Sequence, residues 1–132
     1  MRFIYMIIGL LVSHMGYTTP TLHSKQAILI DATTGTVLFE KNADHVVPPS
    51  SMSKMMTVYM IFKALASHKI HEKTLYPISE KAWRKGGSKM FVTVGSQVSV
   101  EDLLRGVIIQ SGNDAAIALA EGYSGSEEVF AQ

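Results

Sequence analysis

One segment, residues 51–66, is predicted to form a helix that other elements must surround. Its apolar side chains recur at helical spacing but cover more than one stripe, which is typical of a helix buried among other elements. These positions are Met52, Met55, Met56, Tyr59, Met60, Phe62 and Leu65. Four of them are methionines, for which adaptable core filling is a better explanation than a metal or cofactor role. The segment therefore requires a fold that supplies neighbours on several sides.

Two β-rich runs, residues 27–31 and 36–40, are predicted to form a hairpin. Residues 32–35 between them favour a turn, with Gly35 at the position where a positive φ is easiest. A hairpin alone is marginally stable in water, and the only other strand expected is a short one near residues 91–94. This hairpin therefore needs partners.

A second helical region is predicted after residue 99. Ser99 and Asp102 have the spacing of a capping box, and an apolar helix follows them. Its apolar positions are Leu103, Leu104, Val107, Ile108 and Ile109. The pattern breaks at Ser111 and Gly112, and a further Ala-rich helix is expected over residues 114–121. A tight corner between two helices is the consequence.

The composition of the 132 residues fits one modest globular domain, which we expect to cover residues 22–132. The formal net charge is +1 and the lysines are scattered, so no basic stripe is available for nucleic acid. Cysteine is absent, which excludes disulfides, thiolate metal sites and a cysteine nucleophile.

The N-terminus has the layout of a secretory signal peptide. Arg2 precedes an apolar run over residues 3–12, which is too short to span a bilayer of about 30 Å as a helix. We expect residues 1–19 to be the signal peptide, although no Ala-x-Ala triplet defines its cleavage site. Export to the periplasm follows, with membrane contact only through this segment. A buried N-terminal helix and an uncleaved anchor at the inner membrane are the alternatives.

Ser51 and Lys54 are three residues apart at the predicted start of a helix. Such a spacing places the amine within reach of the hydroxyl, and the positive end of the helix favours an alkoxide and a neutral amine base. A Ser-x-x-Lys match is expected roughly once by chance in a chain of this composition. The alternative role for Ser51 is an ordinary helix N-cap.

Ser111, Gly112 and Asn113 form the second string of interest, at the predicted corner between two helices. Their side chains could point into the protein, toward Ser51 and Lys54. The alternative is an ordinary turn in which Asn113 or Asp114 caps the second helix.

The sequence disfavours three other kinds of site: a Ser-His-Asp triad, a histidine metal site and a phosphate-binding loop. All five histidines lie within the first 71 residues without a catalytic context, and no Gly-x-Ser-x-Gly elbow occurs, which disfavours a Ser-His-Asp hydrolase. His68 and His71 are best explained as solvated surface residues rather than metal ligands. The glycines at residues 86–87 lack the spacing of a phosphate-binding loop.

Several stretches together resemble the D-alanyl-D-alanine carboxypeptidases of the low-molecular-mass penicillin-binding protein type, which are SxxK serine peptidases. They are residues 28–31, 49–57, 87–91, 104–106 and 110–115. The likeness runs from about residue 29 to residue 131, which corresponds to the first part of the family's catalytic domain. The implied fold is an α/β fold of the serine β-lactamase and penicillin-binding-protein type, an antiparallel sheet with helices, incomplete in this chain.

The resemblance implies a role for each matching residue. Ser51 would be the acylated nucleophile, Lys54 its base and Ser111 a relay to the leaving group, while Asn113 would position the substrate and orient Lys54. The substrates would be peptidoglycan stem peptides ending in D-Ala-D-Ala, and β-lactams would be covalent inhibitors. No cofactor or metal is implied.

The chain departs from the family in one respect: no Lys-Thr-Gly-type strand occurs before Gln132. We expect a fragment of doubtful activity, in which the hairpin lacks its neighbours and at least two helices expose apolar faces. Two alternative functions remain: a serine β-lactamase, although class A enzymes carry Ser-Asp-Asn where this chain has Ser111-Gly112-Asn113, and a non-catalytic exported remnant.

Overall fold

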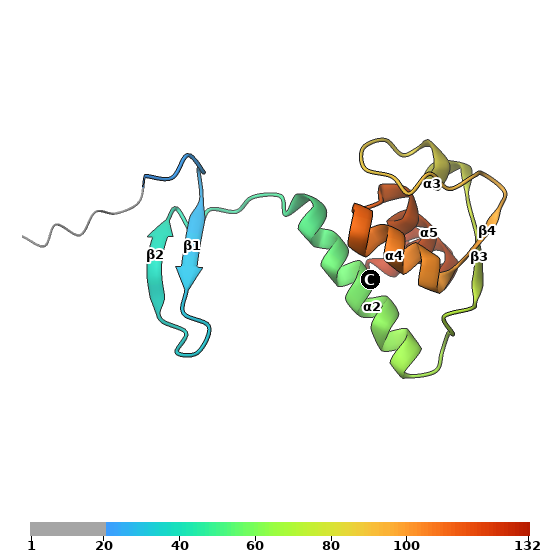
Figure 1. Cartoon of the computed structure of the whole chain (residues 1–132), viewed down its shortest axis with the longest axis horizontal. Coiled ribbons are helices and arrows are strands. Elements are labelled where there is room, and N and C mark those ends of the chain that lie inside the picture. Colours follow the sequence, from blue (N-terminus) through green and yellow to red (C-terminus); the bar gives the residue numbers. More distant parts are fainter. Residues whose placement is uncertain (1–20) are drawn as a thin grey trace, which may run out of the picture. The chain divides into compact units, whose positions relative to one another are not determined.

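The computed structural model describes residues 21–132, which belong to two units, Met1–Val47 and Pro48–Gln132 (Figure 1). The expected signal peptide, residues 1–19, lies outside the described residues. Within residues 21–132, no helix is both long and apolar enough to cross a membrane.

The first unit contains the predicted hairpin. Strands β1 (Ala27–Ile30) and β2 (Val37–Lys41) pair antiparallel. In the turn, one oxygen of the Asp31 carboxylate accepts hydrogen bonds from the backbone N–H groups of Thr33 and Thr34, at 3.0 and 2.7 Å. These bonds, that of Thr34 first, lower the pKa of Asp31 from its ordinary value. Gly35 has the expected positive φ, 73°.

Both faces of this hairpin are exposed. The side chains of Ile28, Leu29, Ile30, Val37 and Leu38 are all at least partly open to solvent. Among the described residues the sheet has only its two strands. A sheet of two strands is marginally stable by itself in water.

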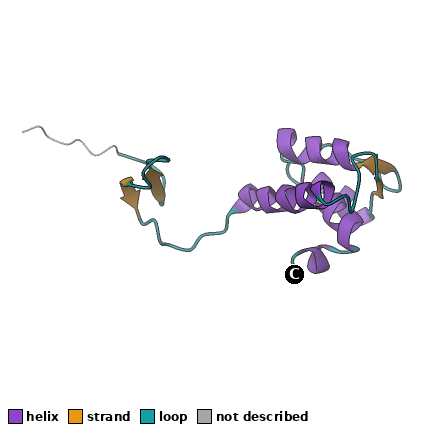
Figure 2. Cartoon of the chain, turned by 90° about the horizontal axis from the view of Figure 1, so that it is seen from below, coloured by secondary structure: helices purple, strands orange, loops and turns teal. Residues whose placement is uncertain are grey.

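The second unit is mainly helical (Figure 2). Its elements are a 3₁₀ turn η1 (Ser50–Ser53), α2 (Lys54–Ala66), β3 (Leu75–Pro77), α3 (Glu80–Arg84), β4 (Gln97–Ser99), α4 (Val100–Gln110), α5 (Asn113–Ser124) and α6 (Glu127–Phe130). Strands β3 and β4, which the sequence did not predict, pair antiparallel. Helix α4 begins with the expected cap, since the Ser99 hydroxyl accepts a hydrogen bond from the Asp102 N–H at 3.1 Å.

Helix α5 is the centre of the core of this unit. It packs against α2, α3, α4 and β3, and Ala115, Ala118 and Leu119 are fully buried. At its far end Gly122 allows the ring of Tyr76 to approach, because a Cβ there would lie 2.1 Å from the ring. Burial of this ring raises the pKa of Tyr76.

Helix α2 is less buried than its sequence pattern predicted. Ile61 and Ala64 are its buried residues, whereas Met52, Met55, Met56, Tyr59 and Phe62 in η1 and α2 are exposed. On α4, Ile108 and Ile109 are exposed as well. The expectation that at least two helices present apolar faces to solvent is therefore confirmed.

The strand expected near residues 91–94 is not formed. This segment is a loop, because the backbone N–H groups of Met90, Phe91 and Val92 donate to the side chain of Asp114 instead of to a neighbouring strand. Phe91 has a left-handed conformation with φ 63°, which is incompatible with an extended chain.

Candidate active site

The 3₁₀ turn η1 and the first residue of α2 carry the first two predicted site residues. Lys54 Nζ donates hydrogen bonds to the Ser51 hydroxyl at 3.1 Å and to the Ser111 hydroxyl at 3.2 Å. Ser51 is not a helix cap: the cap positions of η1 and α2 are Pro49 and Ser53, and neither makes a side-chain capping bond. The Lys54 side chain thus links Ser51 and Ser111, two other predicted site residues, by hydrogen bonds.

Ser111 lies where α4 ends, and its backbone is left-handed, with φ 55° and ψ 35°. This conformation closes the helix, as the next N–H, of Gly112, donates to the carbonyl of Gly106 at 3.0 Å. Glycine or asparagine is the usual residue at such a position. A serine held there brings its hydroxyl toward Lys54 at a conformational cost, a pattern that clusters at functional sites.

Asn113 opens α5 and is held by the loop over residues 86–92. Its side-chain amide donates to the carbonyl of Gly86 at 2.7 Å, and its backbone N–H donates to the carbonyl of Ser88 at 2.7 Å. Gly87 is required at this contact, since its φ is 83° and a Cβ would lie 2.6 Å from Asn113 Nδ2. Within the described residues, Asn113 and Lys54 share no hydrogen bond, so the expected orientation of Lys54 by Asn113 is not made through a direct bond.

Asp114 is the residue that the sequence pattern missed. Its side chain is fully buried, and its carboxylate accepts hydrogen bonds from the backbone N–H groups of Met90, Phe91 and Val92, at 3.0, 3.0 and 3.3 Å. Neither Asn113 nor Asp114 caps α5, whose cap position is Gly112 and carries no side-chain bond. The sequence around Asp114 indicated only a candidate helix cap. Nothing in it indicated hydrogen bonds to residues 90–92, which are more than twenty positions earlier in the chain.

A groove of about 430 Å³ leads from Ser51, Lys54 and Ser111 between α2 and α4. Its other lining residues are Met55, Val58, Tyr59, Phe62, Val107 and Ile108. The polar atoms are thus gathered at one end of an otherwise apolar surface. Nucleophile and base candidates at hydrogen-bond distance are the arrangement that serine acyl transfer requires.

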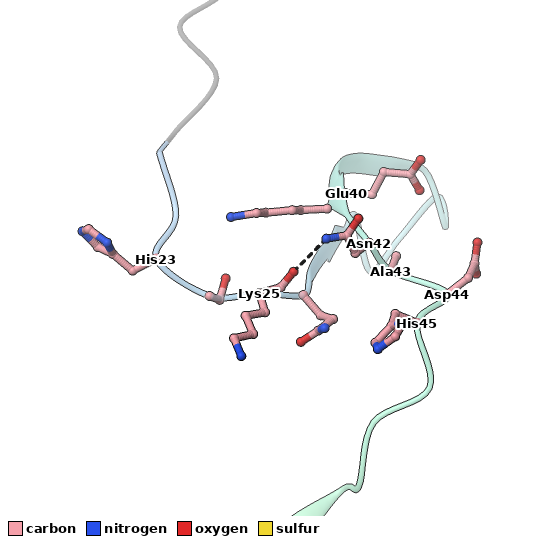
Figure 3. A pocket seen from close by; sticks show the side chains of 10 residues that line it. His23, Lys25, Glu40, Asn42, Ala43, Asp44 and His45 are labelled. Carbon is pink, nitrogen blue, oxygen red and sulfur yellow. Dashed lines mark hydrogen bonds between the residues drawn. The ribbon is translucent and has the colours of Figure 1, made fainter.

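A larger hollow, of about 910 Å³, lies in the first unit and is lined by residues 23–26 and 40–45. Figure 3 shows that the side chains of His23, Lys25 and Asp44 point in different directions, while the Asn42 amide bonds the carbonyl of Lys25 at 3.1 Å. No group of three or more potential metal ligands occurs among residues 21–132. This hollow lacks the convergent side chains of an active site.

Comparison with known proteins identifies relatives of most of the chain. The chain is 44% identical over 117 residues to the D-alanyl-D-alanine carboxypeptidase DacC of Escherichia coli K12, covering 84% of this chain and 29% of that protein. It is also 44% identical over 107 residues to the D-alanyl-D-alanine carboxypeptidase DacF of Bacillus subtilis 168, covering 81% of this chain and 28% of that protein. The chain therefore spans less than a third of the length of these curated relatives.

Solved structures agree on the fold. Penicillin-binding protein 5 of Haemophilus influenzae superposes with a TM-score of 0.75 and 44% identity, over 84% of this chain and 33% of that one. Penicillin-binding protein D2 of Listeria monocytogenes, solved in an ampicillin-bound form, superposes with a TM-score of 0.68 and 27% identity, over 81% of this chain and 43% of that one. The expected penicillin-binding-protein fold, in part, is thereby confirmed. Residues 13–132 also match the model of peptidase family S11, D-alanyl-D-alanine carboxypeptidase. This chain belongs to the D-alanyl-D-alanine carboxypeptidase family of serine peptidases.

Proposed function

We propose that this protein is a serine-type D-Ala-D-Ala carboxypeptidase that removes the terminal D-Ala of peptidoglycan stem peptides through an acyl-enzyme at Ser51. One observation carries the proposal: Lys54 Nζ lies within hydrogen-bond distance of both the Ser51 and the Ser111 hydroxyl oxygens. Membership of the carboxypeptidase family supports the choice of substrate.

The proposed reaction assigns one step to each of these groups. The Ser51 oxygen attacks the carbonyl carbon of the scissile peptide bond while the neutral Lys54 amine accepts its proton. The Ser111 hydroxyl passes a proton from Lys54 to the nitrogen of the leaving D-Ala as the C–N bond breaks. Water then attacks the ester, releasing the shortened peptide and restoring the Ser51 hydroxyl.

β-Lactams are proposed as covalent inhibitors that acylate the same oxygen, with ring opening in place of a leaving group. A relative that binds ampicillin supports this choice. The test is labelling with a fluorescent penicillin. We expect the wild-type chain to be labelled and Ser51→Ala to remain unlabelled.

Ser53→Ala is the matched control, because Ser53 lies in the same 3₁₀ turn and its hydroxyl donates to the carbonyl of Ser50 at 2.8 Å. It should be labelled like the wild type. Equal labelling of wild type and Ser51→Ala, or none of either, would contradict the proposal and favour the non-catalytic remnant. Rapid release of the label from the wild type would instead favour a β-lactamase.

We propose further that the protein is exported to the periplasm. Arg2 followed by the apolar residues 3–12 supports this location. Fusing residues 1–20 to alkaline phosphatase, which is active only after export, tests it directly. Activity should appear with the natural segment and disappear when two residues of the apolar run are replaced by aspartate; equal activity of both fusions would contradict export through this segment.

A further inference from the structure

Asp114 follows the candidate site residue Asn113 and accepts several backbone hydrogen bonds, yet it has no step in the proposed reaction. Asp114 is fully buried, and four backbone N–H groups donate to its carboxylate. Three of them come from the loop at residues 90–92, and the fourth, from Ala115, reaches Oδ1 at 2.9 Å. Bonds to an ionised carboxylate are stronger than those between neutral groups, so this loop is firmly attached to the start of α5.

The same loop also contacts Asn113. Gly86 and Ser88 accept hydrogen bonds from the side-chain amide and the backbone N–H of Asn113, at 2.7 Å each. The loop is therefore held at two adjacent residues of α5, by a carboxylate at one and by donors at the other. Its position determines where the Asn113 amide can point.

Backbone strain in the loop indicates that its shape is imposed. Phe91 has φ 63° although it is a bulky residue, and the residue is 81% exposed, so packing of its ring does not stabilise this conformation. The N–H of this residue is one of the three bound by Asp114. The hydrogen bonds to Asp114 offset the strain.

We propose that Asp114 is a positioning residue for the acyl-transfer site: by anchoring the loop of residues 86–92, it fixes the Asn113 amide, which lines a hollow together with Lys54. The proposal rests on the function proposed above. Asp114 touches no reacting atom in this scheme and acts only through the loop and Asn113.

Asp114→Asn is the informative variant, because it keeps the shape of the side chain and removes half of its acceptors. An amide oxygen at the Oδ1 position would leave the N–H groups of Phe91 and Val92 facing an NH₂ group. An amide oxygen at the Oδ2 position would instead leave the N–H groups of Met90 and Ala115 facing the NH₂ group. Either way two buried donors lose their partner, and the loop should detach.

Asp102→Asn is the matched control for Asp114→Asn. Asp102 also lies in the first turn of a helix, α4, and accepts a hydrogen bond from the Ser99 hydroxyl at 2.6 Å, but it is exposed, and among the described residues it shares no hydrogen bond with the loop. Gly87→Ala is the second test variant. It disturbs the contact with Asn113 from the loop side and leaves Asp114 intact.

The experiment measures the rate and the final extent of labelling by a fluorescent penicillin. A positioning role predicts an acylation rate reduced about tenfold to 100-fold in Asp114→Asn and Gly87→Ala, because misplacement by about 1 Å can cost that much, with an unchanged final extent. Asp102→Asn should react at the wild-type rate. A reduced extent at an unchanged rate would indicate a purely structural role and overturn the proposal.

A second readout does not depend on reactivity. In NMR spectra of the same chains, Asp114→Asn should shift the Asn113 side-chain amide signals and speed hydrogen exchange at the Phe91 N–H. If the wild type is not labelled, the proposed function fails, whereas these signals still decide the role of Asp114. Unchanged Asn113 signals beside a released loop would overturn it.

Discussion

Helices α2 and α5 both begin at the candidate site, yet they are supported very differently. Six residues of α5 are buried, including Asp114 and Leu119, and the helix contacts five other elements, α2, α3, α4, α6 and β3. Helix α2 buries Ile61 and Ala64 and exposes most of its large apolar side chains. The half of the site that carries Ser111 and Asn113 is thus built on a completed core, whereas the half that carries Ser51 and Lys54 stands on a helix with an open face.

This difference predicts that stability depends on α5 far more than on the exposed face of α2. Leu119→Ala removes a fully buried side chain and should lower the free energy of unfolding by about 2–5 kcal/mol. Met56→Ala, on the exposed side of α2, should change it by less than about 0.5 kcal/mol. Urea denaturation followed by circular dichroism measures both; equal losses would show that the open face of α2 is covered in solution.

The packing of α5 against β3 gives the next largest effect. Gly122→Ala would place a methyl group 2.1 Å from the Tyr76 ring, and the required shift should cost about 1–3 kcal/mol. Gly86→Ala is the control, since no atom lies within 4 Å of its added methyl group. A neutral Gly122→Ala would mean that β3 is free to move away from α5.

The serines at two helix starts, Ser99 before α4 and Ser51 before α2, should also differ in their effect on stability. Ser99→Ala removes the N-cap of α4 and should cost about 1 kcal/mol in thermal unfolding. Ser51→Ala removes a hydroxyl that caps nothing, so we expect a change below about 0.5 kcal/mol. A larger loss at Ser51 would give its hydroxyl a structural role and weaken its assignment as a nucleophile.

The smallest effect concerns a surface pair at the start of α4. Glu101 accepts hydrogen bonds from Lys73 at 2.7 Å and Arg105 at 2.6 Å, and the bond from Lys73 is the main cause of its lowered pKa. Because the folded pKa is lowered, this stabilisation is present above the unfolded value, 4.5, and is lost as the pH falls through the folded value.

Glu101→Gln should therefore lower the midpoint of thermal unfolding at pH 7 by no more than about 2 °C, since exposed pairs contribute little. The difference from wild type should shrink at acidic pH and in high salt. A difference that grows as the pH falls would contradict this origin of the stabilisation.

The elements with strong local signals were predictable from the sequence. Two β-rich runs on either side of the turn at Gly35 predicted the hairpin, and Ser99 with Asp102 predicted the start of α4. The break at Ser111 and Gly112 predicted the corner that brings Ser111 to Lys54. In each of these cases the determining contacts lie within a few residues along the chain.

What depends on distant contacts was not predictable. Residues 91–94 have the composition of a strand, but the backbone N–H groups of residues 90–92 donate to the buried carboxylate of Asp114 and not to a neighbouring strand. Strands β3 and β4 have three residues each, too few for a periodic signal. The apolar pattern of α2, taken alone, predicted a buried helix, because such a pattern reports what a helix can bury and not what is present to cover it.

The 3₁₀ turn at residues 50–53 has a consequence for the spacing of the motif. In an α-helix, residues three apart are offset by about 60° around the axis, since each turn takes 3.6 residues. In a 3₁₀ helix, with three residues per turn, they eclipse one another. Ser51 lies within the tighter turn and Lys54 directly follows it, so the two side chains stack along one line. An α-helix continued back through Ser51 would keep the two side chains neighbours but offset them around the axis, so the 3₁₀ turn aligns the hydroxyl with the amine more directly than an α-helix of the same spacing.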